Sequence, residues 1–167
     1  IWIDSKFRMK HWFFRATLVF VATFFSLSVN GKVVTQQKAL EFATRFFANH
    51  VQSRGNMVSM TCVWDSNQLP LNARSLDGNP SFFVFTPSNG KGFIIVAGDD
   101  ASVPVLGYSF ENQIPSVDKL PQNLRLWLEG AHKGIVRARK EGKVSSSLIE
   151  QKWVESRAGD LMAMLKT

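Results

Sequence analysis

The chain has 167 residues, of which 45% are hydrophobic, and a formal net charge of +7 at pH 7. This length suffices for one domain with a substantial core, and the apolar content excludes a disordered chain. Several basic residues lie within the first 31 positions, so the remainder carries only a modest positive charge. No nucleic-acid-binding motif accompanies this charge, so we expect a solvated basic surface and no nucleic-acid partner.

The N-terminal residues predict a secretory signal peptide. Residues 9–15 carry positive charge, residues 16–27 are almost wholly apolar, and residues 29–31 end the run with small side chains. This pattern directs export to the periplasm or the extracellular space. Residues 1–8 precede a good start methionine and are interpreted as an over-extended reading frame. The apolar stretch is shorter than the roughly 20 residues of a membrane span. We therefore favour signal removal over a retained anchor and expect no stable membrane insertion afterwards.

The chain after the signal predicts a helix, four strands and a second helix. Apolar residues recur at three-and-four spacing in the helices, and short apolar runs separated by turn residues mark the strands. The expected elements are a helix capped by Thr35 and ending near His50, strands over 58–64, 82–85, 93–97 and 103–108, and a helix from Pro121 to Gly142. We therefore predict an α+β fold, a four-stranded antiparallel sheet with its helices packed on one face.

No residue pattern predicts catalysis, a metal site or a cofactor. Cys62 has no partner for an internal disulfide and is interpreted as a buried structural thiol. His50 and His132 are isolated helix residues without an orienting third group, so neither is expected to form a catalytic pair with Cys62. Asp99 and Asp100 are interpreted as a solvated turn between strands, because no other ligand is near them in sequence.

One run carries a family resemblance. Gly92–Ser109 has the sequence Gly-Phe-Ile-Ile-Val-Ala-Gly-Asp-Asp-Ala-Ser-Val-Pro-Val-Leu-Gly-Tyr-Ser. In these residues the chain resembles the prodomain of streptopain-type cysteine proteases and the stand-alone, Spi-like inhibitors built on that prodomain. The similarity covers roughly residues 38–142, and Leu120–Leu128 is the next best match. The resemblance implies that the chain restrains a protease and is not itself an enzyme.

The resemblance also implies an inhibitory contact. In the family, an Asn at the start of an apolar helix enters the active-site region and holds the catalytic His out of place; Asn123 is the matching position. Displacing that His would remove both the base and the charge that stabilises the thiolate. Asn123 has a second interpretation, as a capping residue of its helix. The predicted contact residues are Asp118, Pro121, Gln122, Asn123 and Leu124.

These observations predict a domain organisation and leave three functions open. We expect a signal segment over 1–31, a prodomain-like inhibitor domain over 32–142 and a C-terminal tail over 143–167 with no structure assigned. The leading hypothesis is a secreted inhibitor of a streptopain-like cysteine protease. One alternative is a zymogen that has lost its catalytic half. The other is a secreted binding or adhesion module, for which exposed aromatic side chains at Trp64 and Phe110 would matter.

Overall fold

The structure is a computed structural model. It describes residues 31–50, 58–70, 77–88 and 90–155. The predicted signal peptide therefore lies outside the described residues, apart from Gly31. Within those ranges, no helix has the length and apolar character needed to cross a membrane.

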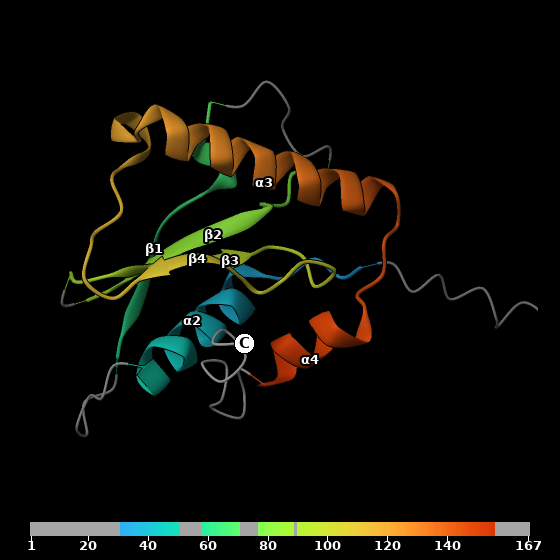
Figure 1. The fold of residues 1–167 in the computed structure, drawn as a ribbon, viewed down its shortest axis with the longest axis horizontal. Coiled ribbons are helices and arrows are strands. Elements are labelled where there is room, and N and C mark those ends of the chain that lie inside the picture. The colour runs from blue at the N-terminus through green and yellow to red at the C-terminus, as the bar shows by residue number, and fades with distance from the viewer. Residues whose placement is uncertain (1–30, 51–57, 71–76, 89, 156–167) are drawn as a thin grey trace, which may run out of the picture.

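Four antiparallel strands form one sheet with the order β1-β2-β3-β4 (Figure 1). The strands are β1 (Met60–Asp65), β2 (Phe82–Pro87), β3 (Phe93–Ala97) and β4 (Val105–Ser109). Each pairs with its neighbour in the chain, and β2 and β3 form the predicted hairpin, with Phe82 opposite Ala97. The predicted strands are confirmed, and β4 is one of the two edges of the sheet.

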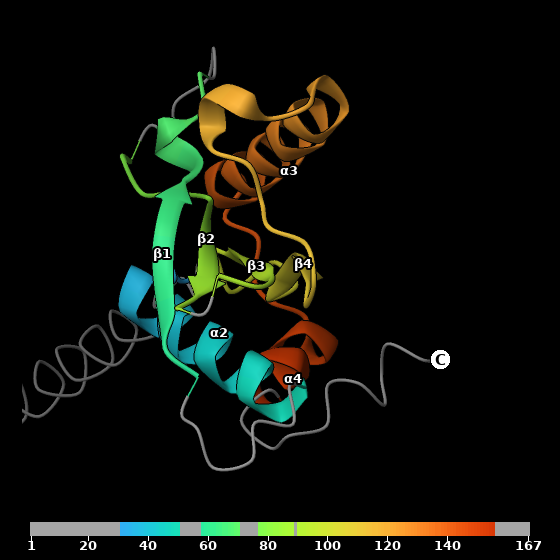
Figure 2. The same cartoon turned by 90° about the vertical axis from the view of Figure 1, so that its left-hand side faces the viewer.

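The helices cover both faces of this sheet. They are α2 (Gln36–His50), α3 (Gln122–Lys140) and α4 (Ser147–Glu155), with two short 3-10 turns, η1 (Ser66–Gln68) and η2 (Val117–Lys119). Figures 1 and 2 show α3 on one face and α2 and α4 on the other. The α+β fold is confirmed. The placement of all helices on one face is wrong, because β2 and β3 are apolar on both sides and each side needs a cover.

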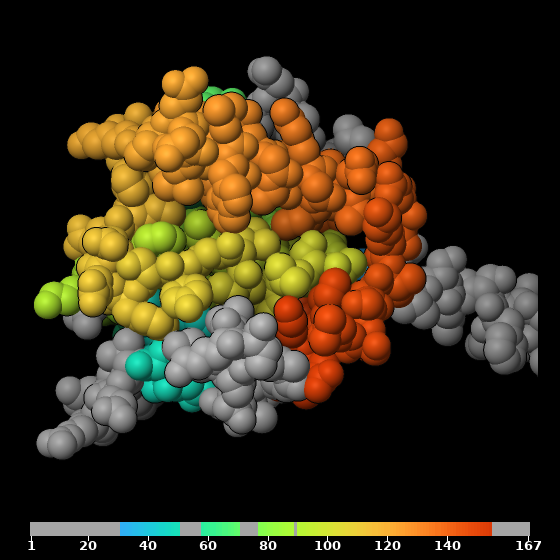
Figure 3. Space-filling view, in the orientation of Figure 1, coloured from blue at the N-terminus to red at the C-terminus, as the bar shows by residue number. Residues whose placement is uncertain are grey.

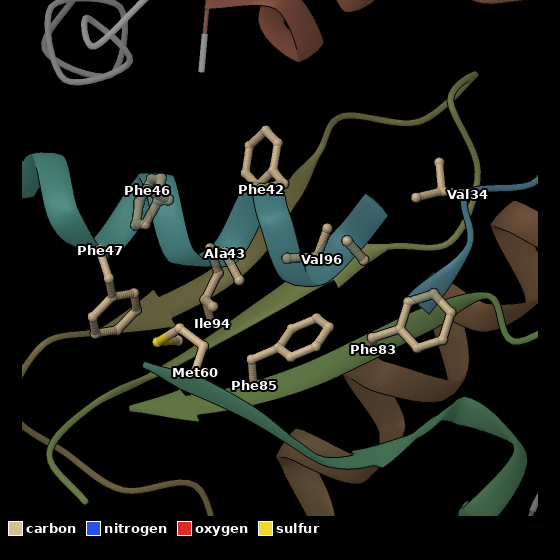
Figure 4. Close-up of a cluster of buried hydrophobic side chains, with 11 residues drawn as sticks. Val34, Phe42, Ala43, Phe46, Phe47, Met60, Phe83, Phe85, Ile94 and Val96 are labelled. Carbon is tan, nitrogen blue, oxygen red and sulfur yellow. The ribbon is translucent and has the colours of Figure 1, made fainter. Parts of the chain in front are cut away.

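The larger core lies between α2 and the sheet (Figure 4). Thr35 caps α2 as predicted, since its Oγ1 accepts a hydrogen bond from the backbone N–H of Lys38 (3.3 Å). The helix then buries one stripe of side chains against alternate residues of the strands. The buried members of this core are Val34, Ala39, Phe42, Ala43, Phe46, Phe47, Met60, Phe83, Phe85, Ile94 and Val96.

The second core lies on the face covered by α3. It takes the strand residues that alternate with those of the first core, as the two-residue period of a strand requires. Its buried members are Trp64, Leu69, Phe82, Val84, Ile95, Leu120 and Leu128. Leu120 and Leu128 bracket the start of α3, so this core holds the N-terminal half of that helix and the turn before it.

At two positions of the family-like run, another part of the backbone comes so close that only glycine fits. Gly92 has a φ of 90°, and a Cβ there would lie 2.5 Å from the carbonyl oxygen of Ser109. A Cβ on Gly98 would lie 2.3 Å from the carbonyl oxygen of Pro80. Both distances are far below contact distance, so no larger residue fits at either position without moving backbone. These glycines therefore belong to the scaffold.

Residues 147–155, from the tail to which no structure was assigned, form α4 and pack onto the domain. The Trp153 ring meets Phe42 of α2 edge to face, with centroids 5.3 Å apart. The indole Nε1 of Trp153 also donates a hydrogen bond to the carbonyl oxygen of Ser102 (3.0 Å). The folded domain therefore extends past residue 142.

Candidate functional site

The five predicted contact residues lie within seven consecutive positions at the N-terminal end of α3. Asp118 lies in the turn η2, and Pro121 occupies the position just before the helix. Gln122 and Asn123 are the first two residues of α3, and Leu124 follows them. We call residues 118–124 the contact segment. Figure 1 shows it where the chain, having crossed from β4, enters α3.

The contact segment is held by its apolar side chains. Leu120 is buried in the core beneath α3, and Leu124 packs against the same core from a half-buried position. Just upstream, Ile114 and Val117 also pack against it. Within the turn, the backbone N–H of Lys119 donates to the carbonyl oxygen of Ser116 (2.9 Å). Apolar packing against the core between α3 and the sheet therefore holds the backbone of the segment in place.

The polar side chains of the contact segment lie on the outside. Asp118, Pro121, Gln122 and Asn123 are all exposed, whereas Leu124 is half-buried. Leu120, which is buried, and Leu124, which is half-buried, thus hold a segment whose polar side chains are exposed. This arrangement leaves four of the five predicted residues accessible to a partner and gives Leu124 a supporting role.

The capping interpretation of Asn123 is wrong. The residue at the cap position is Pro121, and no side chain makes a capping hydrogen bond there. Asn123 is the second residue of the helix, two positions past the cap, so its side-chain oxygen cannot take the cap geometry. Among the hydrogen bonds between described residues, none uses its side-chain amide. The amide therefore has no structural task within the described part of the chain.

The other end of α3 is fastened by a buried cation. Arg139 Nε donates to Asp99 Oδ2 at 2.9 Å, and the side chains are only 10% and 1% exposed. The remaining guanidinium nitrogens donate to backbone carbonyl oxygens of Asn79 (2.9 Å), Pro80 (2.8 Å) and Gly98 (2.6 Å). Hydrogen bonds of this kind satisfy a buried charge. Arg139 thus joins the helix to the turns that enter β2 and leave β3.

Asp99 is not part of a solvated turn, so that prediction is wrong. Its carboxylate is buried because Arg139, forty positions later, pairs with it, and its Oδ1 accepts the backbone N–H of Ala101 (3.0 Å). Asp100 is half-buried, and its Oδ1 accepts the backbone N–H of Lys32 (2.6 Å). Both carboxylates therefore have structural partners. Across the described residues, no group of three or more His, Cys, Asp or Glu side chains could hold a metal ion.

Sequence reasoning also missed a buried polar pair beneath the middle of α3. His132 is 1% exposed, and its Nδ1 lies 2.8 Å from the hydroxyl oxygen of Ser81, which is itself fully buried. The backbone N–H of Ser81 in turn donates to Ser66 Oγ (2.8 Å). His132 follows Leu128 by four positions, so the apolar stripe of the helix, extended by one turn, was a signal that it faces the sheet.

The structure separates Cys62 from His132 and places His50 at the end of α2. Cys62 packs against the core beneath α2, while His132 lies on α3, across the sheet. His50 ends α2 as predicted and stacks on Phe46 and Phe110. Burial, followed by the nearby Asp65 carboxylate, raises the pKa of the Cys62 thiol, which opposes formation of a reactive thiolate.

The aromatic residues proposed for a binding module are not exposed. Trp64 is 4% exposed and packs edge to face on Phe82. Phe110 is half-buried among the rings of Phe47 and His50. The expectation that these side chains form an adhesive surface is therefore wrong, because Trp64 packs in the core beneath α3 and Phe110 packs against the core beneath α2.

A hollow of about 550 Å³ lies between α2 and α4, on the face away from the contact segment. Its wall carries cations and carboxylates together, with Phe42 and Trp153 as its aromatic members. None of the predicted contact residues lines it.

Comparison with known proteins gives one family and one curated relative. The family model described as Spi protease inhibitor matches residues 31–135, which is more than half of the chain. The thiol protease/hemagglutinin PrtT of Porphyromonas gingivalis is 32% identical over 100 residues, which make up 58% of this chain and 10% of PrtT. The chain thus spans about a tenth of that relative's length. No solved structure gives a significant match.

Proposed function

We propose that this chain, which belongs to the Spi protease inhibitor family, inhibits a streptopain-like cysteine protease through its contact segment. The observation that carries the proposal is Asn123, an exposed side-chain amide that none of the described residues engages, on a backbone held by Leu120 and Leu124. The family match includes the whole of this segment. An exposed amide that no described residue engages is available to a partner.

The chemistry of the target explains why an amide suits this role. A cysteine protease needs its thiolate paired with a positioned imidazole. A side-chain amide both donates and accepts hydrogen bonds, and it offers no peptide bond for cleavage. If Asn123 holds the catalytic His away from the Cys, the enzyme loses its base and the positive charge that stabilises its thiolate.

The anchoring of the contact segment favours tight binding. Association costs free energy whenever a loop or a side chain must be ordered at the interface. Here Leu120 and Leu124 already fix the backbone of the segment in the free protein. A segment held in this way loses little further freedom on binding.

A non-catalytic role agrees with the inhibitor family and with the separation of Cys62 from His132. We further propose that the chain acts after export, as the signal-like residues 9–31 predict. The match to a small part of a thiol protease also favours a propeptide, which would make the same contact within one polypeptide.

Titration of the purified protein against a streptopain-type cysteine protease, with a peptide substrate, tests the proposal. We expect stoichiometric inhibition, with Asn123→Ala raising the inhibition constant at least tenfold (about 1.4 kcal/mol). Asn112→Ala is the matched control, because Asn112 is also exposed but lies outside the contact segment. Absence of inhibition by the wild type would refute the function. Equal loss in both variants would refute the role of Asn123.

A further inference from the structure

Two adjacent apolar side chains on α3 are left uncovered by the described part of the domain. Leu126 is 59% exposed and Trp127 is 47% exposed. Their neighbour Leu128 is fully buried beneath the helix, so the apolar stripe that holds α3 to the sheet does not account for them. Single exposed apolar residues are ordinary, but a large exposed Leu and an exposed Trp at consecutive positions of one helix need an explanation.

The patch formed by Leu126 and Trp127 lies on the same side of the helix as Asn123. Residues three and four positions apart are neighbours on a helix surface, so Leu126 and Trp127 both flank Asn123. The Trp127 ring also leans across to the edge strand β4, since a Cβ on Gly107 would lie 3.8 Å from its Cη2 atom. In the space-filling view, α3 (orange) and β4 (yellow) lie next to one another on one face (Figure 3).

The Trp127 ring lies next to Gly107 of β4. A Cβ at this position would lie 3.7 Å from Ile95 Cδ1 and 3.8 Å from Trp127 Cη2, which are ordinary contact distances, so the indole lies close against the strand. The ring therefore rests on the strand with one side and meets solvent with the other. A tryptophan supported in this way offers a large apolar surface at low cost in side-chain entropy.

We propose that Leu126 and Trp127 anchor the catalytic domain of the same protease that Asn123 engages. This inference rests on the proposed function. A stable complex buries about 800 Å² on each partner, with some 20–30 residues a side, which a seven-residue contact segment cannot supply. The additional surface must adjoin that segment, and this patch is continuous with Asn123 on α3.

The family match supports the choice of occupant. Leu126 and Trp127 lie within the matched residues 31–135. Two comparably exposed apolar residues, Leu148 and Val154, lie on α4, outside the match. An inhibitor's anchoring residues belong in the part that its family shares. Tryptophan is also the residue type most enriched among the side chains that carry interface affinity.

The test compares two leucines of similar exposure in the same inhibition titration. Leu126→Ala is paired with Leu148→Ala, whose parent side chain is 55% exposed on α4. We expect Trp127→Ala to raise the inhibition constant about 30-fold and Leu126→Ala about 5-fold, with Trp127→Phe restoring most of the loss. Leu148→Ala should leave the constant unchanged. Thermal melts of each variant establish that the fold is intact.

The outcomes separate the inference from the function. If the wild type inhibits and Trp127→Ala inhibits equally well, the patch is not an anchor although the function stands. If Leu126→Ala and Leu148→Ala weaken inhibition alike, the effect is not local to the patch, and the inference is wrong. If the wild type self-associates in solution and Trp127→Ala abolishes this, the patch belongs to a second copy of the chain. Absence of inhibition by the wild type removes both proposals.

Discussion

The two ends of α3 are built for different tasks. At its C-terminal end, Arg139 is buried and donates hydrogen bonds to one carboxylate and three backbone carbonyls. At its N-terminal end, Gln122 and Asn123 are exposed, and Trp127 is half-exposed one turn later. The same helix is thus held to the domain at one end and presents exposed side chains at the other. Polar groups buried with partners serve the fold, whereas polar groups left without them are the candidates for binding.

The largest expected effect is at the C-terminal end of α3. Arg139→Met removes the cation and leaves the Asp99 carboxylate buried without its partner. We expect the free energy of unfolding to fall by about 3–5 kcal/mol, measured by urea denaturation. The double variant with Asp99→Asn should recover part of this loss, because the buried negative charge is then gone. A loss below 1 kcal/mol for Arg139→Met would mean that the pair does not fasten the helix.

A smaller effect is expected beneath the middle of the helix. Ser81→Ala leaves His132 Nδ1 without the hydroxyl that lies 2.8 Å away. A buried polar group that loses its partner costs about 1–3 kcal/mol, and we expect that loss of stability. Ser88→Ala is the control, because Ser88 is exposed and its hydroxyl donates only to the Ser59 carbonyl oxygen. Equal effects of the two substitutions would contradict the distinction between buried and exposed positions.

At the N-terminal end of α3, stability should hardly change. Gln122→Ala and Asn123→Ala replace exposed side chains, so each should alter the free energy of unfolding by less than about 0.5 kcal/mol. If Asn123→Ala instead lowers stability by more than 1 kcal/mol, the side chain serves the fold, and its proposed role in inhibition loses its main support. Urea denaturation of both variants supplies the measurement.

The smallest effect concerns Cys62, which lies away from both ends of α3. Because its pKa is raised by burial and by Asp65, less thiolate is present near neutral pH in the folded chain than in the unfolded one. Alkylation by iodoacetamide should therefore be slower in the native protein than in urea. This contrast should weaken as the pH rises and the folded thiol ionises. Equal rates at neutral pH would show that the thiol is neither shielded nor shifted.

Much of the fold follows from local pattern, because short apolar runs and turn residues place each strand within a few positions. The side of the sheet that α3 covers was missed, although a signal existed. Phe82–Phe85 is an unbroken apolar run, and such runs are typical of strands buried on both faces. A strand with one face in solvent would instead show alternating apolar and polar residues.

The contact segment was predicted only through the family resemblance, where it stays a prediction, and the Arg139–Asp99 pair was not predicted at all. These two residues lie forty positions apart, and the sequence around either one does not indicate that it pairs with the other. Asp99 sits among turn-forming residues, so local chemistry favours a solvated carboxylate. Long-range ion pairs depend on the tertiary arrangement of elements, which local sequence does not specify.

Because helices cover both faces of β2 and β3, the order in which the helices are synthesised affects folding. During synthesis α2 emerges before the sheet, but α3 emerges after it, so one apolar face has no cover until residues beyond 120 are available. Strands rich in Phe, Ile and Val with such a face are prone to aggregate. A chain cut before α3 should therefore aggregate. In the complete sheet, α3 covers the second apolar face and keeps it from contact with other chains.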